Sequence, residues 1–148
     1  MEKPPHRETA LLTNKHYTEP YVFQPENLLR EARRQKAIAD CDVPYVCVLD
    51  PDGDLANYLL ATGRAAKNPC WACYHSSLYS FEMDGVKMGI VPCAVGAPYA
   101  VLVAEQLFVS GCQLLLSVTS AGVINPPGND KRFALITNAL RDEGTSHH

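Results

Sequence analysis

Three short stretches of the chain carry residue types and spacings that could do chemistry. Cys70-Trp71-Ala72-Cys73 has the spacing of redox dithiols and of half a zinc site. Asp50-Pro51-Asp52-Gly53-Asp54 places carboxylates at alternate positions, as calcium loops do. Thr119-Ser120-Ala121-Gly122 offers hydroxyls and small residues, which let backbone N–H groups approach an anion or a sugar closely.

The residues around these three stretches indicate which of them could form a functional site. The Cys pair has no second pair and leads into strand-like sequence rather than opening a helix, so we expect structural thiols. In the acidic stretch glycine stands fourth rather than sixth, and Ala61 replaces the bidentate Glu of a calcium loop, which favours a simple turn. Dinucleotide and P-loop fingerprints are absent. We therefore expect no metal and no cofactor, and Thr119 to Gly122 is, taken alone, equally consistent with an ordinary turn and a binding loop.

Composition limits the class of protein. A chain of 148 residues, 47% of them hydrophobic and 20% charged, is typical of one globular domain. The net charge of −3 gives no basic field for a phosphate backbone, which argues against nucleic-acid binding. No secretory signal is visible at the start, so we predict a cytoplasmic protein whose six cysteines are mainly buried free thiols rather than bridges. Residues 1–24 are expected to form an arm, and 25–148 the domain.

Local patterns predict alternating helices and strands. The segment from Pro25 to Ala39 is an amphipathic helix whose polar face of arginines and a lysine is either solvated, the favoured interpretation, or anion-binding. Asp84-Gly85 is the commonest tight-hairpin signal. The remaining predictions are strands at Val43–Leu49, Trp71–Glu82, Val86–Ala94, Gln113–Thr119 and Phe133–Leu140, the last with a weaker helical alternative, and helices at Leu55–Thr62 and Pro98–Ser110.

The long apolar stretch between Met88 and Ile124 decides the architecture. Its only charge is Glu105, which raises the possibility of a membrane span, but Gly96 and Gly111 divide it into segments too short to cross a bilayer. An apolar helix between apolar strands is typical of a buried β-α-β crossover. We predict an α/β fold with a mixed central sheet and flanking helices. Ligands of such sheets bind at the carboxyl ends of strands, here Ala94–Pro98 and Thr119–Gly122.

The order of these signals resembles a known family. The segment VGAPYAVLVAEQLFVSGCQLLLSVTSAGVI, with Gly96, Pro98, Gly111 and Ser120-Ala121-Gly122, resembles the nucleoside phosphorylase superfamily, uridine phosphorylases in particular. VPYVCVLDPDGD looks like the first strand and phosphate-binding turn of that family, and RDEGTS (141–146) is similar to a later strand segment. The resemblance implies a phosphorylase/hydrolase-like (Rossmann-like) layout. It also implies that this chain is the amino-terminal portion of such a domain, which would then be incomplete.

The resemblance also implies an activity and a site. Family members cleave the N-glycosidic bond of a nucleoside with phosphate as co-substrate and without a cofactor, and they assemble as homo-oligomers. The residues it assigns to phosphate and ribose are Thr119, Ser120, Gly122, Gly96 and Gly53. His16 is a candidate ribose contact supplied to a neighbouring subunit. No catalytic residue is assigned, because the family's groups that grip the ribose and the leaving base come from a later part of the domain.

Two departures from the family pattern leave the chemistry open. Leu55 and Ser117 stand where family members carry the arginines that hold phosphate. Another cation, such as Arg64 or one from a neighbouring subunit, would restore phosphorolysis. Water in place of phosphate would make the protein a nucleosidase, and the loss of both arginines also fits a non-catalytic binding module.

Overall fold

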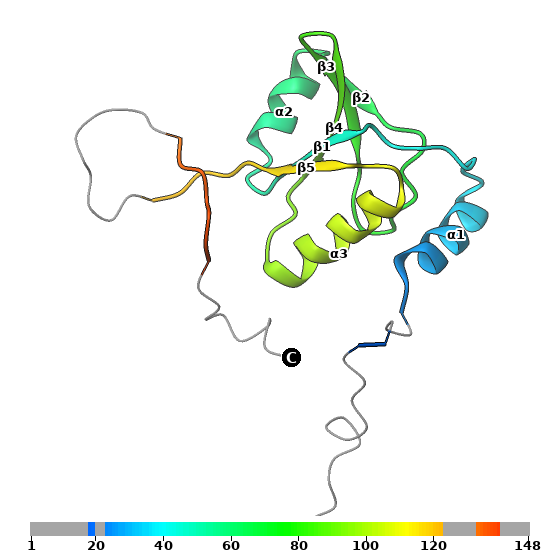
Figure 1. Cartoon of the computed structure of the whole chain (residues 1–148). Coiled ribbons are helices and arrows are strands. Elements are labelled where there is room, and N and C mark those ends of the chain that lie inside the picture. The colour runs from blue at the N-terminus through cyan, green and yellow to red at the C-terminus, as the bar shows by residue number, and fades with distance from the viewer. Residues whose placement is uncertain (1–17, 20–22, 123–132, 140–148) are drawn as a thin grey trace, which may run out of the picture.

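The computed structural model describes residues 18–19, 23–122 and 133–139, and most of the expected arm and the segment 141–146 lie outside this part. The elements alternate as an α/β protein (Figure 1). In chain order they are α1 (Pro25–Lys36), β1 (Val46–Asp50), α2 (Asp54–Ala61), β2 (Ala65–Lys67), β3 (Tyr79–Met83), β4 (Val86–Pro92), α3 (Ala97–Val109) and β5 (Leu114–Ser117).

The five strands form one mixed sheet in the order β2-β3-β4-β1-β5. β1 pairs in parallel with β4 on one side and with β5 on the other, so that Val48 lies between Ile90 and Leu116. β2 and β3 add antiparallel pairs beyond β4. This confirms the mixed central sheet and the β-α-β crossover, in which α3 connects the parallel strands β4 and β5.

The two helices that follow β1 and β4 cover opposite faces of the sheet (Figure 1). α2 packs through Ala56 and Leu59 on a cluster that includes Val48 and Ile90. α3 packs on the other face, where its buried residues Val103 and Leu107 join a cluster with members from β1, β4 and the segment before β3, namely Cys47, Leu49, Val91, Trp71 and Leu78. Because the chain leaves β1 and β4 toward opposite faces, their carboxyl ends flank a topological switch point, where open α/β sheets bind ligands.

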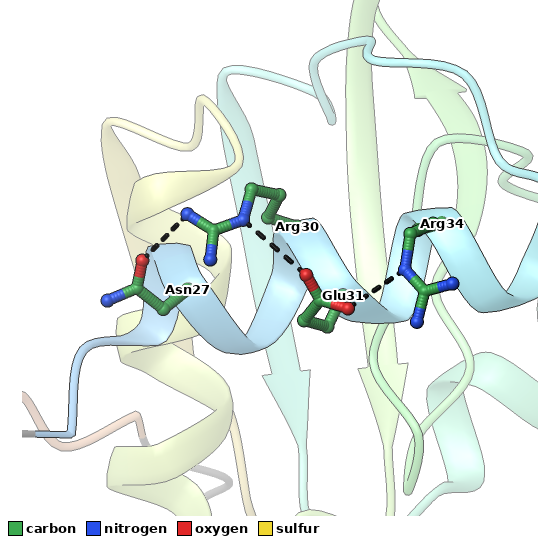
Figure 2. Close-up of polar contacts among 4 residues, drawn as sticks. All are labelled: Asn27, Arg30, Glu31 and Arg34. Carbon is green, nitrogen blue, oxygen red and sulfur yellow. Dashed lines mark hydrogen bonds and ion pairs between the residues drawn. The ribbon is translucent and has the colours of Figure 1, made fainter.

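The cations of α1 are engaged with groups of the chain itself. Arg34 donates to Glu31 at 2.9 Å, and Arg30 contacts Asn27 and Glu31 on the same exposed face (Figure 2). The hydrogen bond from Arg34 is the main cause that lowers the pKa of Glu31, and Arg30 contributes to the same shift. Lys36 donates to the backbone carbonyls of Ala72 and Cys73. The solvated interpretation of this face fits these pairings better than an anion-binding one.

The predicted strand Trp71–Glu82 is only partly confirmed, because strand β3 begins at Tyr79. The Lys36 ammonium donates hydrogen bonds to two backbone carbonyls in this stretch, those of Ala72 at 2.9 Å and Cys73 at 2.6 Å. In a strand these two carbonyls would accept hydrogen bonds from a neighbouring strand. Here they accept them from the Lys36 side chain of α1 instead. We call residues 68–78 the bridging loop. The short strand β2, which precedes it, was not predicted.

Two further predictions are wrong within the described residues. Phe133 to Ala139 has no regular structure and Phe133 is fully exposed, because no neighbouring strand covers this segment. Cys41 and Cys70 form a disulfide, although the cysteines were expected to be mainly buried free thiols, and free Cys93 is exposed. The bridge fastens the segment after α1 to the bridging loop. Cys47, Cys73 and Cys112 are free and buried, as predicted.

The hairpin prediction is confirmed. Asp84 and Gly85 both have left-handed φ values, 51° and 79°, as a two-residue type I′ turn requires. No helix in the described part of the chain is long and apolar enough to span a bilayer.

Candidate functional site at the carboxyl edge of the sheet

The turn after β1 is built around the buried carboxylate of Asp50. Its Oδ1 accepts the Gly53 N–H at 3.2 Å, and its Oδ2 accepts the Ala56 N–H at 2.8 Å. Ala56 lies in the first turn of α2, whose preceding residue, Gly53, has no side chain with which to cap the helix. Asp50 therefore caps α2 from the strand, and an internal anion already satisfies the helix N-terminus.

Gly53 is required by its backbone and by its neighbour. Its φ of 79° lies in the left-handed region, and a Cβ there would come within 2.9 Å of the Cys93 sulfur. The Asp50 carbonyl accepts both the Gly53 N–H, at 3.0 Å, and the Cys93 N–H, at 2.8 Å. The turn after β1 and the residue after β4 are thus joined at one backbone oxygen.

Cys93 itself has a left-handed φ of 58°, which is uncommon for a residue with a side chain. Its thiol is free and exposed. The strained conformation lies beside Gly53, at the switch point between β1 and β4, a position where backbone strain often accompanies function.

The third corner, after β5, contacts the same turn through Asp52. The Asp52 carboxylate accepts the Ser120 N–H at 2.6 Å and the Thr119 hydroxyl at 3.2 Å. The Ser120 N–H is the main reason that the pKa of Asp52 lies below its ordinary value. One step earlier, the Val118 N–H donates to the Leu49 carbonyl at 2.9 Å. The residues after β1, β4 and β5 therefore form one connected edge, which we call the carboxyl-edge site.

The structure brings together some of the sequence-predicted residues. Gly53, Thr119 and Ser120 lie in the connected edge. Gly96 caps α3 with a φ of 91°, and nothing lies within 4 Å of the Cβ position at Gly96 or at Gly122. Both glycines are open to an approaching molecule, but no contact links them to Asp52. His16 lies outside the described residues.

The positions expected to carry arginine lie at this edge without charge. Leu55 is in the first turn of α2, and Ser117 ends β5. Arg64 does not replace them. It directly precedes Ala65, the first residue of β2. Across the sheet, Ala65 pairs with Phe81, Phe81 with Met88, and Met88 with Val46, which is the first residue of β1. Arg64 therefore lies at the amino-terminal edge of the sheet, opposite the carboxyl-edge site, and the proposed substitution of Arg64 for the missing cations is wrong.

Three carboxylates lie at this edge. Asp50 and Asp52 accept hydrogen bonds there, and Asp54 opens α2 beside them. No group of three or more His, Cys, Asp or Glu residues in the described part of the chain is arranged to hold a metal ion. The edge as it stands offers polar backbone and hydroxyl groups with two bound carboxylates.

The small-residue corner was predicted from the sequence, but the contact of Asp52 with it was not. Asp52 was interpreted as part of a simple turn, and it is 68 residues from Ser120 along the chain. A local signal existed, because a carboxylate directly after a central strand faces the edge at which parallel strands end. Which donors it would meet depends on the pairing of β1 with β5, which no local pattern specifies.

Comparison with known proteins yields a structural similarity only. No protein-family model matches the chain, and no curated protein matches it. Among solved structures, the chain is similar to uridine phosphorylase from Vibrio fischeri, with a TM-score of 0.43 and 22% sequence identity. The similarity covers 55% of this chain and 33% of that chain, so the present chain spans a minor part of the length of that protein.

Proposed function

We propose that the chain is part of a nucleoside phosphorylase-like enzyme that cleaves the N-glycosidic bond of a nucleoside with phosphate. The proposal starts from the resemblance of residues 95–124 to that family. The observation that supports it best is that the Thr119 hydroxyl and the Ser120 N–H donate hydrogen bonds to the Asp52 carboxylate, at 3.2 and 2.6 Å. Donors that hold one oxyanion at the carboxyl edge of the sheet are suited to hold another.

The chemistry needs an anion at this position. As the bond between ribose C1′ and the base nitrogen lengthens, the sugar acquires positive charge, and an oxyanion beside C1′ stabilises that charge. A phosphate oxygen then bonds to C1′, while the base leaves with the bonding electron pair and takes up a proton. Thr119 and Ser120 would orient the phosphate, and the open backbone at Gly96 and Gly122 would allow close approach of the sugar.

Phosphate must displace Asp52 to reach these donors. The carboxylate occupies them in the absence of a ligand, and its charge has the same sign as phosphate. Leu55 and Ser117 stand where the family has arginines, and the proposal takes the cation that compensates a dianion from a neighbouring subunit. A homo-oligomer in which arms complete neighbouring sites, with His16 as a ribose contact, is therefore part of the proposal.

The same observation favours hydrolysis as a second candidate function. A water molecule carries no charge to be repelled by Asp52, and it needs no arginine. The oxocarbenium-like sugar would be stabilised by the carboxylate of Asp52 itself, an exposed residue at this edge. In this case water adds to C1′, and ribose is released in place of ribose 1-phosphate.

A phosphate-dependence assay separates these candidates. The full chain is incubated with a panel of purine and pyrimidine nucleosides, with and without phosphate, and the free base and the sugar product are measured. Phosphorolysis predicts base release that depends on phosphate and yields ribose 1-phosphate. Equal base release without phosphate would identify a hydrolase. Saturable nucleoside binding without any base release would contradict both candidates and leave a binding module.

A variant of Asp52 tests the anion site independently of turnover. Asp52→Asn keeps an oxygen that accepts the Ser120 N–H and removes the charge, so phosphate affinity measured by calorimetry is expected to rise about tenfold, an effect of roughly 1.4 kcal/mol. Asp54→Asn removes a charge two residues away, at the start of α2, and is the matched control. Unchanged or equal effects of the two variants would contradict an anion site at Ser120.

A further inference from the structure

A cavity of about 470 Å³ lies outside the carboxyl-edge site. It opens between the end of α1, the end of β2 and the bridging loop, and none of the residues discussed at the carboxyl-edge site lines it. Its volume is within the range of small-molecule sites in proteins. The proposed nucleoside chemistry does not use this region.

The walls of this cavity are held by specific contacts. The Trp71 indole N–H donates to the Ser76 hydroxyl at 3.0 Å across the bridging loop. The Asn68 side chain accepts the Cys70 N–H at 2.9 Å and donates to Ser80 at 2.8 Å. The Cys41–Cys70 disulfide fastens the loop beside them. A cavity with walls fixed in this way is preformed, and a ligand loses little free energy in ordering it.

The charged side chains that line the cavity are both lysines. The lining contains Lys36 and Lys67 and no carboxylate, although the chain as a whole carries a net charge of −3. Lys36 uses hydrogen bonds to the Ala72 and Cys73 carbonyls and lies 4.9 Å from the centroid of the Tyr74 ring. An ammonium has three N–H donors, so one N–H of Lys36 remains for a ligand.

Lys67 is the more available of the two cations. It ends β2, its side chain is exposed, and no hydrogen bond or ion pair joins that side chain to another described residue. Two like charges beside one cavity, without a compensating carboxylate in the lining, attract an anion. The hydroxyl of Ser77 adds a further hydrogen-bonding group to the lining.

Part of the lining is apolar. Trp71 belongs to the core cluster on which α3 packs and keeps a small exposed part at the cavity, and half-buried Ile38 lines the cavity from the segment after α1. Apolar walls with a few polar or charged groups are typical of sites for small organic molecules. Inorganic phosphate would satisfy the lysines but leave these walls in contact with water.

We propose that this cavity binds a small organic anion whose phosphate or carboxylate group is held by Lys67 and Lys36 and whose apolar framework packs against Trp71 and Ile38. The site is separate from the nucleoside proposal and does not depend on it. Lys67 supplies the charge that selects the ligand. Lys36 both contributes charge and holds the bridging loop in place.

The chain provides its own reporter for this site. Trp71 is the only tryptophan in the sequence, so intrinsic fluorescence reports on the cavity. Phenyl phosphate and benzoate are titrated into the full chain, with benzyl alcohol and inorganic phosphate as comparisons, and binding is confirmed by calorimetry. Saturable binding of phenyl phosphate or benzoate is expected, and the tighter of the two identifies the anionic group. Benzyl alcohol and inorganic phosphate should each bind at least about tenfold more weakly.

A lysine variant locates the binding. Lys67→Gln removes an exposed charge without touching a contact of the fold, and it should weaken the tighter anion about tenfold while the thermal transition stays unchanged. Lys87→Gln, an exposed lysine on β4 outside the cavity lining, is the matched control and should have no effect. The proposal is overturned if neither organic anion gives saturable binding, if benzyl alcohol binds as tightly, or if the two variants behave alike.

Discussion

Asp52 is held at the carboxyl edge by donors 67 and 68 residues away in the chain. Hydrogen bonds from Ser120 and Thr119 favour the charged carboxylate, which is why its pKa is lowered. A lowered pKa in the folded state means that the contact contributes its stability above the ordinary aspartate value of about 3.9. That contribution is lost as the pH falls through the lowered value.

We therefore predict an acid-dependent change that is local to this corner. The chemical shift of the Ser120 amide, followed by NMR as the pH is lowered, should change with a midpoint below about 3.9. The same titration of Asp52→Asn should show no such step. A midpoint at or above the ordinary value would mean that Asp52 does not bind Ser120 in solution.

The free cysteines differ sharply in environment, which gives a second prediction. Burial, with the neighbouring Cys112 as a smaller cause, raises the pKa of the Cys47 thiol to about 12. Because the thiolate is the reactive form, iodoacetamide at pH 8 should label exposed Cys93 and spare Cys47 and Cys112 in the native chain. Mass spectrometry of peptides reads the order of labelling. In urea the three residues should react alike, and early labelling of Cys47 in the native chain would contradict the core packing.

At the scale of elements, the Cys41–Cys70 bridge replaces the pairing that a strand would have supplied. It joins residues 29 apart and links the segment after α1 to the bridging loop. Closing a loop of that length stabilises a folded chain by roughly 3–4 kcal/mol on chain-entropy grounds. Lys36 reinforces the same junction through the Ala72 and Cys73 carbonyls.

We predict that Cys41→Ser combined with Cys70→Ser lowers the free energy of unfolding by roughly 3 kcal/mol, measured by urea denaturation. The original chain in a reducing buffer should match the double variant, and the reducing agent should not change the double variant further. Equal stability of the oxidised and reduced chains would show that the bridge does not contribute.

The elements that the sequence predicts correctly are those with local signals. The Asp84-Gly85 turn and the proline near the start of α1 act through neighbouring residues alone. The β-α-β crossover follows from the length and polarity of three consecutive segments. The bridging loop escaped prediction because its carbonyls bind Lys36, more than 30 residues earlier. For the same reason the small-residue corner at Ser120 was predictable, whereas its occupation by Asp52 was not.

At the scale of the whole molecule, β5 is the last strand of the sheet that the described residues form. Within the described residues, β5 pairs with β1 and with no other strand. Leu115 packs toward the core, but Leu114 and Leu116, on the opposite face, are 47% and 41% exposed. A free strand edge that carries exposed leucines is a template for pairing with another strand.

We therefore predict that the full chain self-associates through β5. Sedimentation velocity should show a mass that rises with protein concentration, because the strand edge and its leucines are complementary to the same edge of a second copy. Leu116→Lys places a charge on the exposed face and should weaken association about tenfold. Val86→Lys adds the same charge at an exposed valine in the hairpin and should leave association unchanged. A chain that stays monomeric at all concentrations, or that responds equally to both substitutions, would show that the edge at β5 does not pair.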